Sequence, residues 1–396
     1  MRFFISIALL VLLVYGGTRL YRRTRGAKWL DHLFGTGFAF CLIGVLAGPS
    51  AAGLLSPTML TELEPFVIFS LGWVGFLVGM QADLALLRQV PRCYFTFTFV
   101  ESGLSIAAIT LLCMLMFSQL GVSGYDLVLL SLLAGGCAGV SSQALPLLAG
   151  ERMHKQESLF LRVITGLDDF PTMILVMVLF AYAGPGRILH TLWSGAFWLL
   201  VTVFLGMGFG LVFCTLLRAR AKFDETLAIC IGVTVLAAGA AAYLHLAVPG
   251  LGFLAGLIVA NARLPKKQTF YSVLTTVEHP IVYLMLIIAG AHLRFDQSWW
   301  LIPLVAYVIV RGVAKVLSGR LTGMILGGDS GVSSRIGWGL IASGPLSVAV
   351  ALDYHCVQHG PNSELLLWMV TTGAILGEML VPWAVRRLGT EESSSG

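Results

Sequence analysis

Two apolar segments are each interrupted near their middle by small and hydroxyl residues and a proline. Residues 132–148 read LLAGGCAGVSSQALPLL, and residues 340–352 read LIASGPLSVAVAL. Such interruptions favour helices that unwind part-way across a bilayer. Close helix packing through small residues is the alternative interpretation. Because the interruptions recur in corresponding places, around residues 139–142 and 343–345, we expect paired discontinuous helices.

Two further pairs of segments indicate an inverted repeat. The sequence FCLIGVLAGP at 40–49 is similar to GFLAGLIVAN at 252–261, and FLVGMQADL at 76–84 is similar to LIIAGAHLRF at 286–295. In each pair the second member comes seven apolar segments after the first, and the two interrupted segments have the same offset. An odd offset places the second copy in the membrane with the opposite orientation, as in many transporters.

The chain is hydrophobic from end to end. Of its 396 residues 57% are hydrophobic and 11% are charged, and the mean hydropathy is +0.88, whereas a soluble domain has about one quarter charged residues. These values exclude a soluble enzyme and predict an all-α polytopic membrane protein with about thirteen transmembrane helices. Spans 1–6 are repeated as spans 8–13, and span 7 is a linker. The predicted spans lie near residues 3–18, 34–55, 65–87, 94–117, 126–148, 158–183, 190–217, 225–244, 249–262, 273–293, 299–319, 336–353 and 365–385.

The 25 basic residues follow a topological pattern. With the N-terminus outside, nineteen of them fall in the inner connections of the predicted spans and three, Arg2, Arg187 and Arg294, in the outer ones. Membrane proteins carry such an excess on the cytoplasmic side. The pattern predicts an external N-terminus and a cytoplasmic C-terminus, and it leaves no basic patch for nucleic acid.

Two adjacent acidic residues lie in the sixth span, within ITGLDDFPTMIL at 164–175. A charged group inside a membrane helix costs at least ~2.5 kcal/mol on insertion scales, so Asp168 and Asp169 need a physical reason. Neighbouring residues on a helix point about 100° apart, so one carboxylate can face an ion cavity while the other meets a basic partner. Lys315, or Arg311 one turn earlier, is the expected partner. A buried ion pair that only joins two helices is the alternative, but it leaves the second acid without a role.

A carboxylate in such a cavity can bind either a proton or a metal cation, and occupancy by one excludes the other. If the site crosses the membrane when occupied and not when bare, cation and proton are exchanged. We assign Asp169 to this competitive site and Asp168 to the pair with Lys315.

Residues of the interrupted segments are candidates to line the cation path. Ser141 and Ser142 lie in the first segment, and Ser343 and Gly344 lie in the second. Hydroxyls and free carbonyls there can ligate a cation, whereas serine that packs or bonds its own backbone is the alternative.

Other polar residues of the spans have more than one interpretation. Glu101 and Glu378 are candidates for second acids near the site, for alternative partners of Lys315, or for local pairs at helix contacts. His292 and His355 lie near the outer ends of spans 10 and 12, which suits either a pH sensor or an interfacial histidine.

Taken in order, several strings of this chain resemble the sodium/hydrogen exchanger family, in particular its second branch of monovalent cation:proton antiporters, which includes the Kef-type proteins. Singly these strings are weak, but the ordered set is specific and covers nearly the whole chain. The strings are GFAFCLIGVLAGP (37–49), LGWVGFLVGMQADLALLR (71–88), GVSSQALPLL (139–148), ITGLDDFPTMIL (164–175), VPGLGFLAGLIVAN (248–261), YLMLIIAGAHLRF (283–295), VRGVAKVLSG (310–319) and GAILGEMLVPWAVRRL (373–388).

This resemblance implies a core of six helices with two crossed, unwound helices, a separate dimerisation domain, elevator-type alternating access and a homodimer. By similarity, Asp169 is the cation and proton carboxylate, Asp168 is its neighbour, and Lys315 is the facing base, with Arg311 as second candidate. Kef-type members usually have Gln at the position of Asp168, whereas a double Asp with a facing Lys is similar to electrogenic sodium/proton antiporters. Gln143 stands where a threonine is more familiar.

The sequence therefore predicts a secondary active monovalent cation/proton antiporter of the bacterial inner membrane, electrogenic, and not an enzyme. Sodium is the first expected cation and potassium the second. Residues 1–388 are expected to form the transmembrane domain and residues 389–396 a short cytoplasmic tail. The expected partners are the cation, protons, the lipid bilayer and a second copy of the chain, and no cofactor is expected.

Three rival functions are a sodium-coupled symporter of organic anions with a similar architecture, an intramembrane aspartyl protease and a membrane sensor that does not transport. In such a sensor the paired interrupted helices would have no purpose. A large apolar substrate cavity would favour the symporter. The protease requires two aspartates that share a water from different helices, whereas Asp168 and Asp169 are adjacent.

Overall fold

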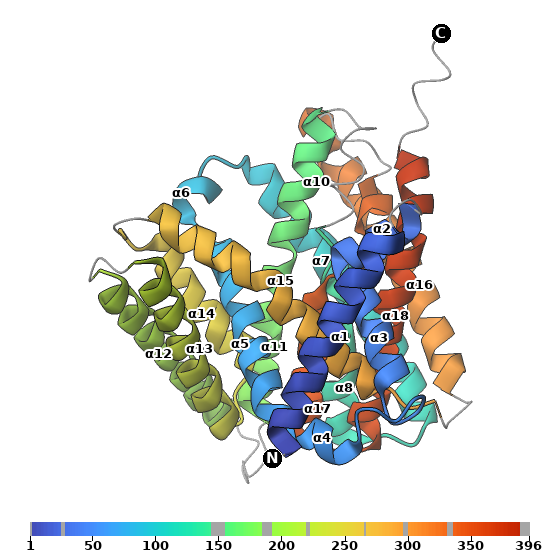
Figure 1. The fold of residues 1–396 in the computed structure, drawn as a ribbon. Coiled ribbons are helices and arrows are strands. Elements are labelled where there is room, and N and C mark those ends of the chain that lie inside the picture. The colour runs from blue at the N-terminus through green and yellow to red at the C-terminus, as the bar shows by residue number, and fades with distance from the viewer. Residues whose placement is uncertain are drawn as a thin grey trace.

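The computed structural model describes residues 2–24, 28–143, 155–183, 192–218, 222–264, 267–295, 300–330 and 336–388. Within these ranges the regular structure is helical and contains no β-strand (Figure 1). The predicted tail lies outside them. The helices are α1 (Arg2–Thr24), α2 (Lys28–Thr36), α3 (Phe38–Ala47), α4 (Pro57–Glu62), α5 (Glu64–Met80), α6 (Leu84–Leu87), α7 (Arg92–Gln119), α8 (Gly124–Gly139), α10 (Lys155–Leu167), α11 (Asp169–Ala183), α12 (Leu192–Leu217), α13 (Phe223–Tyr243), α14 (Val248–Asn261), α15 (Lys267–Ala291), α16 (Leu301–Ser330), the 3-10 helix η2 (Ile336–Leu340), α17 (Pro345–Val357) and α18 (Pro361–Leu388).

The polytopic all-α architecture is confirmed. In the part of the chain that the structure describes, seven helices are long and apolar enough to cross a membrane, and six shorter apolar helices accompany them. Each of these helices overlaps one of the predicted spans, while the total number of membrane crossings stays a prediction. α1 begins at the lower end of the molecule in Figure 1, and α18 ends at the upper end.

Large apolar side chains face outward from several long helices. Trp193 and Phe204 on α12 are 87% and 71% exposed, and Tyr243 at the end of α13 is 85% exposed. Exposing such an apolar surface to water would cost free energy, whereas the hydrocarbon tails of lipids are themselves apolar. The backbone groups of these helices bond within each helix, which is what the bilayer interior requires.

Glycines allow two pairs of helices to pack backbone to backbone. α5 packs along α14, where a methyl group on Gly79 would overlap the carbonyl of Phe253. α3 packs along α15, where a methyl group on Gly290 would overlap the carbonyl of Cys41. α5 and α14 occupy predicted spans 3 and 9. In the predicted inverted repeat these correspond to spans 10 and 2, which are α15 and α3. The two contacts are therefore the matched pair that such a repeat requires. The reciprocal close contacts are Gly256 with Phe76 and Gly44 with Ile287.

Both interrupted segments leave the helical conformation where the sequence predicts it. α8 ends at Gly139 and is followed by the non-helical residues 140–142, and residues 341–344 separate η2 from α17. The two non-helical stretches meet, because the Ser142 N–H donates to the Ala342 carbonyl over 2.9 Å. We refer to this contact of the two non-helical stretches as the crossing. Residues 144–154, which continue the first segment, lie outside the described ranges.

The helices pack as two groups. The crossing group contains α7, α8, α10, α11, α16, η2, α17 and α18, and the flanking group contains α1 to α5 and α12 to α15. In Figure 1 α12 and α13 lie at the left edge, and α16 and α18 lie at the right. α11 lies at the seam between the groups, because it packs on both α8 and α12. Asp169 is its first residue, so the predicted site lies at this seam.

Candidate functional site

The two adjacent acids occupy a break in the sixth span. Asp168 is the turn residue between α10 and α11, although its N–H still donates to the Ile164 carbonyl over 2.9 Å. Asp168 is fully buried, and Asp169 is 5% exposed. Both carboxylate oxygens of Asp168 and Oδ1 of Asp169 have no hydrogen-bond partner within the described ranges. Buried polar atoms are usually satisfied, so these oxygens are available to bind a proton or a cation.

Arg311 of α16 holds the crossing together. Its guanidinium donates to the carbonyl of Ile341, to that of Val140 over 2.9 Å and to that of Ala342 over 3.3 Å. The three acceptors come from both non-helical stretches, whose carbonyls have lost their helical donors. The fixed fork of an arginine suits several acceptors at once. Arg311 thus bonds the backbone of the crossing, while no ion pair joins it to Asp168 among the described residues.

Lys315 is the base that faces the acids. It is fully buried, and its Nζ donates to the Gly139 carbonyl over 2.5 Å. The same Nζ lies 3.7 Å from Oδ2 of Asp168 and 3.3 Å from Oε2 of Glu101. The expected contact of Lys315 with Asp168 is present, but Glu101 is the nearer acid.

Glu101 of α7 is a fully bonded carboxylate. Its Oε1 accepts hydrogen bonds from Ser105 and Ser318, each over 2.9 Å, while Oε2 faces Lys315. Of the interpretations that the sequence leaves open for Glu101, the geometry supports a partner of Lys315. The negative charge of Glu101 balances the positive charge of Lys315 in a buried region, where an unpaired charge would be costly.

The serines of the crossing differ in what they contact. Ser141 lies near Asp168, but its buried hydroxyl is outside hydrogen-bond geometry and has no partner within the described ranges. Ser142 contributes its backbone to the crossing, and Ser343 is 2% exposed. A Cβ on Gly344 would lie 3.2 Å from the Ser141 carbonyl, so the two stretches touch there. Ser141 is therefore a hydroxyl that can ligate an ion beside the acids.

Glu378 of α18 is placed differently. Its Oε2 lies 2.6 Å from Nε2 of His32 on α2, and both side chains are buried. Of the interpretations that the sequence leaves open for Glu378, the geometry supports a local pair at a helix contact. Sequence reasoning did not find His32, because the two residues are 346 positions apart and no motif connects them.

The side-chain amides of Gln81 and Gln143 lie beside α10, close to the two aspartates. Nε2 of Gln143 donates to Oε1 of Gln81 over 3.1 Å, and both residues are exposed. A Cβ on Gly166 would lie 3.3 Å from that oxygen of Gln81, so the pair covers Gly166, three residues before Asp169. The sequence drew attention to Gln143 but gave no signal for Gln81, which directly follows α5 of the flanking group.

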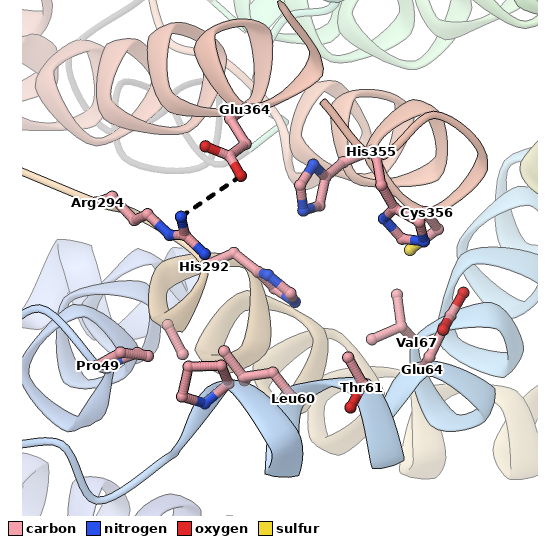
Figure 2. A pocket seen from close by; sticks show the side chains of 13 residues that line it. Pro49, Leu60, Thr61, Glu64, Val67, His292, Arg294, His355, Cys356 and Glu364 are labelled. Carbon is pink, nitrogen blue, oxygen red and sulfur yellow. Dashed lines mark ion pairs between the residues drawn. The ribbon is translucent and has the colours of Figure 1, made fainter. Parts of the chain in front are cut away.

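A pocket of about 190 Å³ lies at the end of the molecule where α4 and α17 meet (Figure 2). The rings of His292 and His355 are 5.1 Å apart, and those of His355 and His359 are 5.9 Å apart. Arg294 pairs with Glu364 over 3.7 Å, as the dashed line in Figure 2 marks. These residues come from both helix groups. No cluster of three or more metal-ligating side chains with metal-binding geometry occurs in the described part of the chain.

The chain was compared with known proteins and structures. A protein-family model described as sodium/hydrogen exchanger, transmembrane, matches residues 7–387. The ammonium/H⁺ antiporter subunit AmhT of Alkalihalophilus pseudofirmus is 27% identical over 323 residues, which are 78% of this chain and 79% of that protein.

Two structures of the sodium proton antiporter MjNhaP1 from Methanocaldococcus jannaschii have the same fold. One, determined at pH 8, matches with a TM-score of 0.72 and 12% identity over 98% of this chain and 99% of the other. The second, from a 3D EM map, matches with a TM-score of 0.65 and 11% identity over 100% of each chain. At this identity the structures establish the fold alone. The family model, however, spans nearly the entire sequence, and this chain belongs to the sodium/hydrogen exchanger family.

Proposed function

We propose that this protein is a secondary active antiporter that exchanges a monovalent cation for protons at Asp169. The observation that carries the proposal is the buried carboxylate of Asp169, whose Oδ1 has no hydrogen-bond partner within the described ranges. Such a carboxylate can hold a proton or a cation in turn and so avoid a bare charge inside the membrane. Family membership and the antiporter relative support the same reaction.

Asp168 and Ser141 are the proposed further ligands of the cation. Lys315 lies between Asp168 and Glu101, with Glu101 nearer. When a cation displaces Lys315 from Asp168, the lysine loses one of its two acidic partners and can release its proton. Asp169 releases a second proton, so two protons leave for one monovalent cation and the exchange moves net charge.

Alternating access arises from movement of the crossing group against the flanking group. Asp168 and Asp169 belong to the crossing group and lie at its seam with α12 and α14. The non-helical stretches and Arg311 keep the site rigid within the crossing group, so the group can carry the ion as one body. This is the elevator-type motion that the family resemblance implies.

Sodium is the first candidate for the cation, and potassium and ammonium are the others. Sodium follows from the double Asp with a facing Lys, and potassium follows from the likeness to Kef-type proteins. Ammonium is included because the AmhT relative is named an ammonium/H⁺ antiporter subunit. Ser141 and the two carboxylates offer oxygen ligands, which suit all three ions.

The test is charge movement on a solid-supported membrane with reconstituted protein, using jumps of Na⁺, K⁺ and NH₄⁺ at several pH values. Wild type is compared with Asp169→Asn and with Asp353→Asn. Asp353 is a matched control, because it is also a buried aspartate but accepts a hydrogen bond from the Val248 N–H over 3.2 Å.

We expect a cation-evoked, pH-dependent current that Asp169→Asn abolishes and Asp353→Asn retains. The ion that evokes it is the substrate. A pH-sensitive dye in the same vesicles detects electroneutral exchange, which would contradict the electrogenic stoichiometry. An Asp169→Asn protein that is folded and exchanges normally would contradict the site.

A further inference from the structure

A buried histidine and glutamate connect the two helix groups at a distance from the proposed cation site. His32 of α2 and Glu378 of α18 approach to 2.6 Å between Nε2 and Oε2, and their side chains are 3% and 0% exposed. α2 belongs to the flanking group and α18 to the crossing group. The proposed exchange reaction assigns no role to either residue.

The surroundings of Glu378 leave one of its carboxylate oxygens as a vacant acceptor. Its second oxygen, Oε1, is buried and has no hydrogen-bond partner within the described ranges. A cavity of about 140 Å³ adjoins it, lined by Leu33, Glu378, Met379 and Pro382. A cavity of this size has room for water, and Glu378 is the polar residue of its lining.

The charged neighbours of the pair are few. Arg311 of α16 acts electrostatically on Glu378. α3, which packs on α2, has no charged residue, and the exposed Arg19 is the charged side chain that the structure describes on α1. His32 is therefore the group of this contact that changes charge most readily near neutral pH.

The pair is also mechanically connected to the crossing. Gly377, the residue before Glu378, lies against the non-helical stretch: a Cβ there would be 3.5 Å from the Ile341 carbonyl and 3.7 Å from the Ser343 nitrogen. The contact of His32 with Glu378 thus ties α2 to the segment of α18 that supports the crossing. Movement of the crossing group against α2 must break this contact.

We propose that His32 and Glu378 form a second proton-binding site, which holds the crossing group against the flanking group while His32 is protonated. The protonated pair is an imidazolium beside a carboxylate, and separating it inside the protein leaves a buried charge without a partner. When the proton leaves His32, the attraction between opposite charges is lost. The neutral imidazole can keep only an ordinary hydrogen bond to Glu378, so the crossing group separates more easily. The effect of this release on transport rests on the proposed antiport function.

The expected sign follows from the charge of His32. At low pH the pair is charged and holds the two groups together, so transport is slow. As pH rises and the imidazolium loses its proton, the hold weakens and transport becomes faster. Protons that compete with the cation at Asp169 also slow transport, but a saturating cation concentration overcomes that competition.

The first test measures the maximal transport rate at saturating cation between pH 6 and pH 8. In wild type we expect this rate to rise severalfold over the range, because release of the crossing group requires the loss of one proton from the pair. In His32→Gln and Glu378→Gln the rise should fall below about twofold, with the higher rate already reached at pH 6. His279→Gln, at an exposed histidine on α15, is the control and should keep the wild-type profile.

A second test does not depend on transport. Hydrogen–deuterium exchange of residues 28–36 and 377–385, corrected for the intrinsic pH dependence, should increase from pH 6 to pH 8 in wild type and stay constant in His32→Gln. Unchanged profiles of both folded variants in both tests would overturn the proposal. If wild type transports no cation, the antiport function fails and the exchange data alone decide whether the pair is a proton-controlled contact.

Discussion

Lys315 contacts two acids, and the nearer one is not an aspartate of the proposed cation site. Glu101 lies 3.3 Å from its Nζ and Asp168 lies 3.7 Å away. Two serine hydroxyls and the lysine together satisfy Glu101, whereas the oxygens of Asp168 receive no hydrogen bond within the described ranges. Glu101 therefore stabilises the lysine, whereas Asp168 is available to an ion.

Removal of the Glu101 charge should destabilise the folded protein. Glu101→Gln leaves Lys315 buried with only the more distant Asp168, and breaking a buried ion pair costs about 3–5 kcal/mol. We expect a clear decrease in the thermal unfolding temperature in detergent. The double variant Glu101→Gln, Lys315→Met should lose less than the sum of the two single changes, because the lysine and its nearer acid are removed together. Strict additivity would contradict the pairing; Asp224→Asn, at an exposed acid, is the control.

The amides of Gln81 and Gln143 should affect how a cation reaches Asp169. Gln81→Ala removes the acceptor of their 3.1 Å hydrogen bond, over Gly166. A lost hydrogen bond of about 0.5–1.5 kcal/mol corresponds to a KM for the cation about two- to tenfold higher, with the maximal rate unchanged. Gln89→Ala is the matched control, because its amide bonds the Ala85 carbonyl of its own helix turn. Equal KM values for both variants would exclude a role for the pair.

At the scale of elements, the close pairing of α5 with α14 and of α3 with α15 depends on glycine. Gly79 and Gly290 each face a backbone carbonyl of the partner helix, so the helices approach as closely as backbones allow. Small residues permit this approach in a bilayer, where the hydrophobic effect does not drive helices together. The flanking group therefore gains its rigidity from backbone contact.

Alanine at either glycine should loosen these pairs. In Gly79→Ala and in Gly290→Ala the new methyl group overlaps a carbonyl that cannot move aside, and overpacking of this kind costs about 1–3 kcal/mol. We expect lower thermal unfolding temperatures for both. Gly239→Ala on α13 is the control, because no atom lies within 4 Å of its added Cβ. This change should stabilise the helix by about 0.5–1 kcal/mol. Equal stability of all three variants would contradict backbone-to-backbone packing.

At the scale of the whole molecule, the two helix groups are connected by polar contacts at both ends of their seam. The His32–Glu378 pair and the Gln81–Gln143 pair cross the seam, as does the hydrogen bond of Val248 with Asp353. At the end shown in Figure 2, His292 of the flanking side faces His355 of the crossing group. Movement of one group against the other must exchange some of these contacts.

The histidine pocket makes the molecule sensitive to acid. Burial, together with Arg294 and His359, lowers the pKa of His292, one residue beyond the end of α15, to about 4. A histidine in an unfolded chain titrates near 6.5, so between these two values the unfolded chain binds a proton that the folded protein does not. Stability therefore falls as pH falls from about 6.5 to about 4, by at most about 3 kcal/mol from this residue.

His292→Gln should weaken this acid dependence. The measurement is the thermal unfolding temperature in detergent at pH 7 and at pH 4.5, for wild type, His292→Gln and the exposed-histidine control His279→Gln. We expect a smaller difference between the two pH values in His292→Gln than in the other two proteins. The same difference in all three would show that another group causes the acid sensitivity.

The sequence by itself determined the helical class, the positions of the apolar helices and the two interruptions. These features are local: a bilayer requires long apolar helices, and Gly, Ser and Pro in the middle of one break it wherever the rest of the chain lies. The adjacent Asp168 and Asp169 were also evident, because charge inside an apolar span is rare. The repeat could be predicted for the same reason, since similar strings recur at a fixed offset.

Only the tertiary structure decided which side chains meet. Glu101 and Lys315 are 214 positions apart, Gln81 and Gln143 are 62 apart, and His32 and Glu378 are 346 apart. The sequence could suggest Lys315 as a base for Asp168, but it could not show that Glu101 lies nearer or that Arg311 bonds the crossing carbonyls. Helix periodicity fixes which residues share a face, whereas the partner of that face depends on how helices distant in sequence pack together.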